Sequence, residues 1–308
     1  MISKKEELKK TYRKDQFYRE SILLINDFSN EVLGGELDRL KTYCFDNLKG
    51  SFKYAYPNIE QIHKWKFDCD DTKLSRAIYC VTWGYIFNLK EESYKSEYRG
   101  DTMNSFNTLF GDEDRGIFAY RARFYDMDKD IKAWSNIIKF KYQYHTIGNF
   151  IVLPNKGKLK KGTIDKFSGS INIERSSKFK DYFDLFLIDL DIYKSTKTNE
   201  SKLKEFFDEN SFYKEFSMSK MKEIFFLDDY FNGEEPKEFI GIPKGDRFKL
   251  TGSKEYRKNK KGCFSQKEYT KLVNEYIAKS EEVISNRADK IIDVLKEEIK
   301  EAKKIGIL

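Results

Sequence analysis

Residues 144–154 read YHTIGNFIVLP, and within them a histidine stands just before a Gly-Asn pair that leads into an apolar run. Apolar residues with high strand propensity, closed by Pro154, favour a short strand over Phe150–Leu153. The histidine, His145, is one of only two in 308 residues. This stretch therefore predicts a small β element and, beside it, a candidate polar site.

Helical patterns lie on both sides of this stretch. Upstream, residues 72–88 carry apolar side chains on nearly every face, which predicts a central helix covered on most sides. Downstream, residues 178–193 and 266–303 carry wide apolar stripes at a spacing of three or four residues. We therefore expect an α+β protein that is predominantly α-helical, with helical bundle lobes around a small β element near residues 148–175.

This expectation divides the chain into two parts. Residues 1–140 are expected to form a helical N-terminal lobe, and residues 141–308 the small β element plus a helical bundle closed by the C-terminal helix. Shorter helical patterns complete both parts, at residues 3–33, 37–48, 126–142, 202–207, 212–216 and 221–231.

The composition indicates a folded protein, because 26 Phe and 20 Tyr supply large buried areas although 35% of the residues are charged. No apolar run is long enough to span a bilayer, and the N-terminus shows no signal-peptide core. We therefore expect a cytoplasmic protein with no membrane partner. The four cysteines are irregularly spaced and include no C-x-x-C, which argues against a zinc knuckle and a disulfide framework. Spacing alone predicts no metal site.

Positive charge is concentrated in one segment, residues 244–261, which we call the basic segment. The net charge of the chain is only +7, from 58 basic and 51 acidic residues. Between Gly241 and Gly262, eight basic residues stand against Asp246 and Glu255, a formal +6. The candidate nucleic-acid-binding residues are Lys244, Arg247, Lys249, Lys254, Tyr256, Arg257, Lys258, Lys260 and Lys261.

The basic segment has two interpretations. Cations mixed with the rings of Phe248, Tyr256 and Phe264 are typical of surfaces that grip phosphates and stack bases. The alternative is a solvated charged loop without a ligand. Lysine outnumbers arginine here, so any binding should favour the nucleic-acid backbone, depend strongly on salt and show little sequence preference.

A second candidate site centres on His145, Asn149 and Asn172. The pattern His-x-x-Gly-Asn-hydrophobic at residues 145–150, followed by the Asn172 segment and by Ile-x-x-Arg at residues 284–287, is similar to the C-terminal HNH-like domain of GmrSD-type modification-dependent restriction enzymes. The resemblance implies a metal-dependent nuclease in which His145 is the general base and an Asn orients it; only then is a divalent metal expected as cofactor. The alternative is a structural His145 that donates to a backbone carbonyl at a helix–strand junction.

A broader resemblance covers roughly residues 140–290. The runs FDLFL (183–187), KEFF (204–207) and FFLDDY (225–230), downstream of the Gly148-Asn149 strand, resemble a bacterial family known only as a domain of unknown function. In that family a small strand region precedes a helical half and an Arg-containing terminal helix. The resemblance implies a fold and assigns no catalytic residue.

Acidic residues gather just before the predicted helix at 72–88. Asp68, Asp70 and Asp71, with Asp101, could converge on Mg²⁺, because hard cations take oxygen ligands. Their position directly before a helix favours an N-terminal cap instead.

Three classes of function remain open at this point. The first is an intracellular protein that binds nucleic acid or a nucleoprotein complex, in the setting of conflict between phage and host genomes. The second is a divergent HNH-like metal-dependent nuclease. The third is a protein–protein interaction or inhibitor module that docks on an acidic partner.

Overall fold

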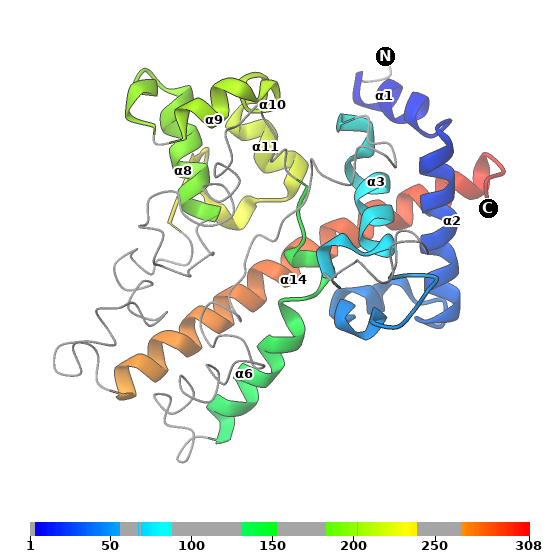
Figure 1. Cartoon of the computed structure of the whole chain (residues 1–308), viewed down its shortest axis with the longest axis horizontal. Coiled ribbons are helices and arrows are strands. Elements are labelled where there is room, and N and C mark those ends of the chain that lie inside the picture. Colours follow the sequence, from blue (N-terminus) through cyan, green and yellow to red (C-terminus); the bar gives the residue numbers. More distant parts are fainter. Residues whose placement is uncertain are drawn as a thin grey trace. The chain divides into compact units, whose positions relative to one another are not determined.

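The computed structural model describes residues 4–55, 67, 69–87, 131–152, 183–201, 203–238 and 266–308. Within these ranges the chain is mostly helical, with a two-stranded antiparallel sheet (Figure 1). The predicted class, α+β and predominantly α-helical, is confirmed.

The described elements fall into two compact units, each assembled from separate segments. The α-helices are α1 (Lys4–Tyr12), α2 (Gln16–Glu31), α3 (Lys73–Phe87), α6 (Ile131–Gln143), α8 (Phe183–Lys194), α9 (Lys204–Glu209), α10 (Ser211–Glu215), α11 (Met218–Phe225) and α14 (Gln266–Lys304). The short 3₁₀ helices are η1 (Leu37–Thr42), η2 (Phe45–Leu48), η4 (Cys69–Asp71), η7 (Ile147–Asn149), η8 (Thr198–Glu200) and η9 (Asp228–Tyr230). Unit 1 comprises residues 1–101, 145–154 and 284–308; unit 2 comprises residues 102–144 and 155–283. The predicted lobes at 1–140 and 141–308 remain a prediction.

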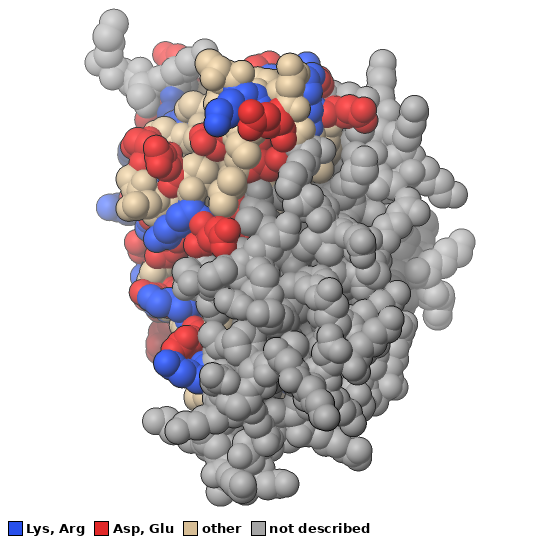
Figure 2. All heavy atoms as spheres, turned by 90° about the vertical axis from the view of Figure 1, so that its left-hand side faces the viewer, with Lys and Arg blue, Asp and Glu red and all other residues tan. Residues whose placement is uncertain are grey.

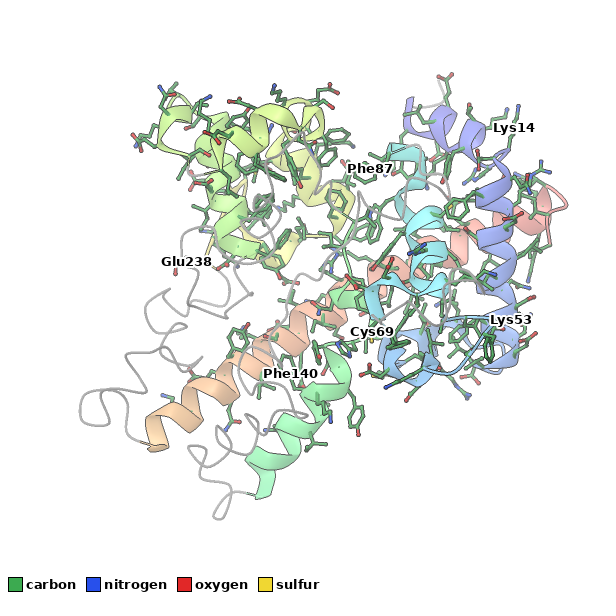
Figure 3. The ribbon with its side chains drawn as sticks, in the orientation of Figure 1. Lys14, Lys53, Cys69, Phe87, Phe140 and Glu238 are labelled. Atoms are coloured by element: carbon green, nitrogen blue, oxygen red, sulfur yellow. The ribbon has the colours of Figure 1, made fainter. Side chains whose placement is uncertain are left out.

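The core of unit 1 is built around α3. Every residue from Leu74 to Gly84 is buried, as expected for a helix with apolar side chains on most faces. α2 packs against α3 and buries a stripe that includes Ile22, Ile25 and Phe28; side chains crowd the space between the two ribbons in Figure 3. The apolar periodicity of the sequence thus places the centre of this unit correctly.

The cap of α3 differs from the predicted one. The Thr72 hydroxyl accepts a hydrogen bond from the Ser75 backbone N–H at 3.0 Å, so Thr72 is the capping side chain. Asp71 instead accepts hydrogen bonds from the Arg76 guanidinium, the shorter at 2.7 Å. Asp70 receives the Tyr79 hydroxyl at its backbone carbonyl. Asp70 and Asp71 therefore precede the capping position, which Thr72 occupies. Asp68 and Asp101 lie outside the described residues.

A buried ionic cluster joins the two ends of unit 1. The Glu298 carboxylate, on α14, is 2% exposed. It accepts hydrogen bonds from Arg13 at 2.8 Å, from Lys9 at 3.0 Å and from the Tyr18 hydroxyl at 2.8 Å. Burial by itself raises the pKa of Glu298, but Arg13, Lys9 and Tyr18 outweigh it and hold that pKa below its ordinary value of 4.5. Glu298 is therefore a charged anchor for the N-terminal helices.

Unit 2 is organised by aromatic rings. The Phe186 ring meets those of Phe207 and Tyr213 with centroids 5.5 and 5.6 Å apart, which joins α8 to α9 and α10. The buried Asp189 carboxylate accepts hydrogen bonds from the Ser201 hydroxyl and the Leu203 backbone N–H, at 3.1 and 2.9 Å. The short helices predicted from this part of the sequence are therefore present, although 221–231 breaks after Phe225.

The described sheet lies in a different place from the predicted strand. β1 (Phe231–Asn232) pairs with β2 (Glu235–Pro236) around a turn in which Gly233 has φ +62°. In the predicted strand, Phe150 makes only a bridge, and Ile151 and Val152 have no regular structure. Residues 147–149 form the 3₁₀ helix η7. Residues 153–175 lie outside the described ranges.

We expect Glu298→Gln to lower the free energy of unfolding at pH 7 by about 3 kcal/mol, because it removes the counter-charge of two partly buried cations. The folded state holds the pKa of Glu298 below 4.5, so the stabilisation is present above that pH and is lost as the pH falls below it. The difference from wild type should therefore shrink in acid. Urea unfolding across a pH series measures both effects.

The matched control is Glu301→Gln, which removes a more exposed carboxylate 3.6 Å from Lys304. Its cost should be below about 0.5 kcal/mol. Equal losses in the two variants would contradict the anchoring role of Glu298.

Candidate functional site

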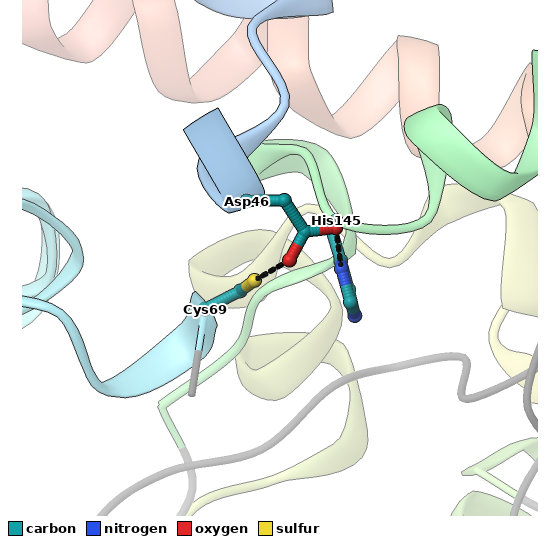
Figure 4. A group of neighbouring side chains, drawn as sticks. All are labelled: Asp46, Cys69 and His145. Carbon is teal, nitrogen blue, oxygen red and sulfur yellow. Dashed lines mark hydrogen bonds and ion pairs between the residues drawn. The ribbon is translucent and has the colours of Figure 1, made fainter. Parts of the chain in front are cut away.

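The side chains of Asp46, Cys69 and His145 come from distant parts of the sequence and meet at the Asp46 carboxylate. His145 Nδ1 lies 2.7 Å from Asp46 Oδ2, and the Cys69 thiol donates to Asp46 Oδ1 at 3.0 Å. Figure 4 shows the carboxylate between the other two side chains. The ligand-type atoms of the three residues all lie within 4.8 Å of one another. We call Asp46, Cys69 and His145 the Asp46 cluster.

Backbone and ring contacts hold the members of the cluster together. Asp46 is in η2, whose first residue, Phe45, donates its N–H to the His145 carbonyl at 2.9 Å. The Phe45 ring also packs edge-on against Phe150, with centroids 5.1 Å apart. Cys69 begins η4, which leads directly into the buried helix α3. Each side chain of the cluster is therefore attached to the core of unit 1.

The segment after His145 lies directly on α14. A Cβ atom at Gly148 would come within 1.9 Å of the Ile284 carbonyl oxygen, so only glycine fits at this position. The buried Arg287 guanidinium donates to the carbonyls of Gly148 and Phe150, to the latter at 3.0 Å. The His-x-x-Gly-Asn and Ile-x-x-Arg patterns thus meet in space.

The electrostatics of the cluster centre on the carboxylate. Partial burial raises the pKa of Asp46, but hydrogen bonds from His145, Cys69 and Cys44 outweigh it and lower that pKa to about 2. The Cys44 thiol is 3.7 Å from Asp46 Oδ2. An ionised carboxylate can only accept, so the proton shared with His145 belongs to Nδ1.

The cluster is reachable from solvent on one side. The side chains of Asp46 and His145 are 46% and 20% exposed, whereas Cys69 is buried. Without a metal, Asp46 orients the imidazole with Nε2 as its other nitrogen, an arrangement suited to acid–base chemistry. With a metal, the same groups offer one sulfur, one nitrogen and one oxygen. This donor set fits a zinc-class ion and does not fit Mg²⁺, which requires oxygen ligands.

Of the predicted catalytic residues that the structure describes, only His145 lies in the Asp46 cluster. Asn149 is completely buried within unit 1. Asn172 lies outside the described residues. The sequence did not identify Asp46 or Cys69, because Asp46 is 99 residues from His145 and no spacing rule connects them. The only local signal was the Cys44-x-Asp46 pair.

The basic segment, Lys244 to Lys261, also lies outside the described residues, and its nine candidate residues remain a prediction. On the face drawn in Figure 2, described basic and acidic side chains are interspersed. Among the described residues, oppositely charged side chains also form local pairs, such as Lys220–Glu223 at 2.9 Å and Lys204–Asp208. The described surface of that face therefore carries a mixture of charges.

No protein-family model, curated protein or solved structure matches this chain. The two family resemblances therefore remain predictions that rest on the residues quoted above. None of the helices in the described ranges combines the length and the apolar character needed to cross a bilayer.

We expect Gly148→Ala to lower the free energy of unfolding by about 3 kcal/mol, because the added methyl group overlaps the Ile284 carbonyl. Gly233→Ala is the comparison variant, since φ is +62° there and nothing lies within 4 Å of the added Cβ. That change carries only a backbone cost of about 1 kcal/mol. Urea unfolding of both variants measures the difference, and a loss in Gly148→Ala no larger than in Gly233→Ala would contradict the close contact.

Proposed function

We propose that this protein binds nucleic acid, free or within a nucleoprotein complex, through the basic segment. The observation that supports the proposal is the formal +6 carried between residues 241 and 262 in a chain whose total is +7. Nearly all of the net positive charge is thus concentrated in one short stretch. A polyanion is the natural partner of such a stretch, because each neutralised phosphate releases counterions.

The residue types define what kind of nucleic acid is bound. Lysine ammonium groups act as point charges on phosphates, whereas the planar arginine fork is better suited to bidentate contacts with guanine edges. The rings of Phe248, Tyr256 and Phe264 offer surfaces on which unpaired bases stack. The proposed ligand is therefore single-stranded or locally opened nucleic acid, bound with little sequence preference. A role in conflict between phage and host genomes is part of this proposal.

Fluorescence anisotropy with single-stranded and duplex probes across a salt series tests the proposal. A variant with glutamine at Lys254, Arg257, Lys258, Lys260 and Lys261 should bind at least about 100-fold more weakly and show a salt slope lower by about 3 to 4. The control variant carries glutamine at five exposed lysines elsewhere, namely Lys10, Lys14, Lys49, Lys73 and Lys303. Equal losses in both variants would exclude this function. So would the absence of wild-type binding at about 50 mM salt, because phosphate contacts are strongest at low salt.

A second candidate is supported by the Asp46 cluster: a divergent metal-dependent nuclease. Three metal-type donors converge there within 4.8 Å, and two of them reach solvent. A divalent ion in this place would lower the pKa of a bound water, so that the water could lose its proton near neutral pH and become the nucleophile for phosphodiester cleavage. The chain's own part is to hold the ion with Asp46, Cys69 and His145, so that His145 serves as a ligand.

Incubation of plasmid DNA and RNA with Zn²⁺, Mn²⁺ or Mg²⁺ tests this candidate. Wild-type protein should cleave with Zn²⁺ or Mn²⁺, and His145→Ala should lose at least about 100-fold of the rate, because the ligand set is broken. The surface variant Lys73→Gln should retain full activity. Equal cleavage by wild type and His145→Ala would identify a contaminating nuclease and exclude the candidate.

A further inference from the structure

We infer that Asp46, Cys69 and His145 form a binding site for a single zinc-class divalent ion. The inference concerns the ion and its ligands, and it stands whether or not the protein cleaves or binds nucleic acid. It starts from the convergence of three different donor atoms, from three separate segments, within 4.8 Å.

The donor types select the class of ion. Zn²⁺ accepts thiolate, imidazole and carboxylate ligands in one tetrahedral shell, whereas Mg²⁺ and Ca²⁺ take oxygen and leave sulfur aside. The thiol of Cys69 points at the carboxylate that also contacts His145. A sulfur, a nitrogen and an oxygen therefore lie within 4.8 Å of one another, a donor set that favours Zn²⁺, or Co²⁺ as its spectroscopic substitute.

The distances are close to those of a tetrahedral shell. With zinc bonds of about 2.0 to 2.3 Å, neighbouring ligand atoms lie about 3.3 to 3.7 Å apart. In the Asp46 cluster His145 Nδ1 lies 2.7 Å from Asp46 Oδ2, the Cys69 sulfur lies 3.0 Å from the other carboxylate oxygen, Oδ1, and one ligand atom from each residue lies within 4.8 Å of the other two. Side-chain rotations that move each donor atom by about 1 Å, so that one carboxylate oxygen, the nitrogen and the sulfur surround a common point, would admit the ion.

The surroundings hold the donors in place before any ion arrives. The Phe45 N–H donates to the His145 carbonyl at 2.9 Å, which ties two of the ligand segments together. Arg287 fixes the carbonyls of Gly148 and Phe150 on the same segment as His145. A site whose ligands are already held in place binds an ion more tightly than a flexible one, because less conformational entropy is lost on binding.

The site is open on the side of Asp46, whose side chain is 46% exposed. Three protein ligands with an accessible fourth position are the pattern of zinc sites that keep a water molecule. Binding releases one proton, since the Cys69 thiol becomes a thiolate and its proton passes to the buffer. The neutral imidazole keeps its proton, which moves from Nδ1 to Nε2 as Nδ1 becomes the ligand.

Titration of the metal-free full chain with Zn²⁺, in competition with a chromophoric chelator, tests the inference. We expect one ion per chain, and a loss of affinity of at least about 10-fold in each of Asp46→Asn, Cys69→Ser and His145→Ala. With Co²⁺, the wild type should show a thiolate-to-metal charge-transfer band that Cys69→Ser abolishes and Asp46→Asn retains. Circular dichroism confirms that each variant is folded; Asp46 and His145 reach solvent, so at least these two should fold normally.

Cys44→Ser is the matched control, because Cys44 lies 3.7 Å from the same carboxylate and is not a member of the three-donor group. Its zinc affinity should stay within about 3-fold of wild type. Absence of one-to-one binding, or binding that persists in both Cys69→Ser and His145→Ala, would overturn the site. A loss in Cys44→Ser equal to that in Cys69→Ser would overturn the three-ligand assignment. Zinc binding without cleavage of nucleic acid would exclude the nuclease candidate alone.

Discussion

The close approach of Gly148 to the Ile284 carbonyl determines how the candidate site is built. Because no side chain fits between them, the backbone at Gly148 approaches α14 closely, and the Arg287 guanidinium donates to the carbonyls of Gly148 and Phe150. Three residues earlier on the same segment, His145 then meets Asp46. A tight backbone contact in the core thus positions a side chain that reaches solvent.

Helix α14 carries two buried charged residues, Arg287 and Glu298, and each has partners that fix the position of the helix. Arg287 and Glu298 are 11 residues apart, about three helical turns, so both face the interior. Between them Ile291 and Leu295 are fully buried and supply the apolar part of the stripe. Sliding α14 by one turn would leave Arg287 without its carbonyls and Glu298 without its cations. Each buried charge left without its partners would cost about 3 to 5 kcal/mol. These two residues therefore specify the register of α14 in unit 1, while the apolar residues supply most of the free energy that holds the helix there.

The sequence predicts the parts of this structure that depend on local periodicity. The predicted helices at 72–88 and 266–303 correspond to α3 and α14, because a sustained apolar pattern has only one regular solution. The prediction for residues 37–48 was wrong, because two 3₁₀ helices replace one α-helix there. The sheet β1–β2 was not predicted from the sequence, and the β element expected near residues 148–175 stays a prediction, because residues 153–175 lie outside the described ranges. Residues 37–48 are shaped by contacts with distant residues, such as the bond from Phe45 to His145. The Asp46 cluster was missed for the same reason: it exists only after the chain has folded.

The Asp46 carboxylate decides between two kinds of chemistry at this site. As a hydrogen-bond acceptor it holds the proton of His145 on Nδ1 and leaves Nε2 as the basic nitrogen, which is the arrangement a general base requires. As a metal ligand it would hold an ion together with Nδ1, and the imidazole proton would then occupy Nε2, so that the imidazole could not act as a base. The two roles of His145 exclude each other. The thiol of Cys69 favours the second role, because a general base requires only the carboxylate, whereas a buried sulfur directed at that carboxylate completes a zinc-type donor set.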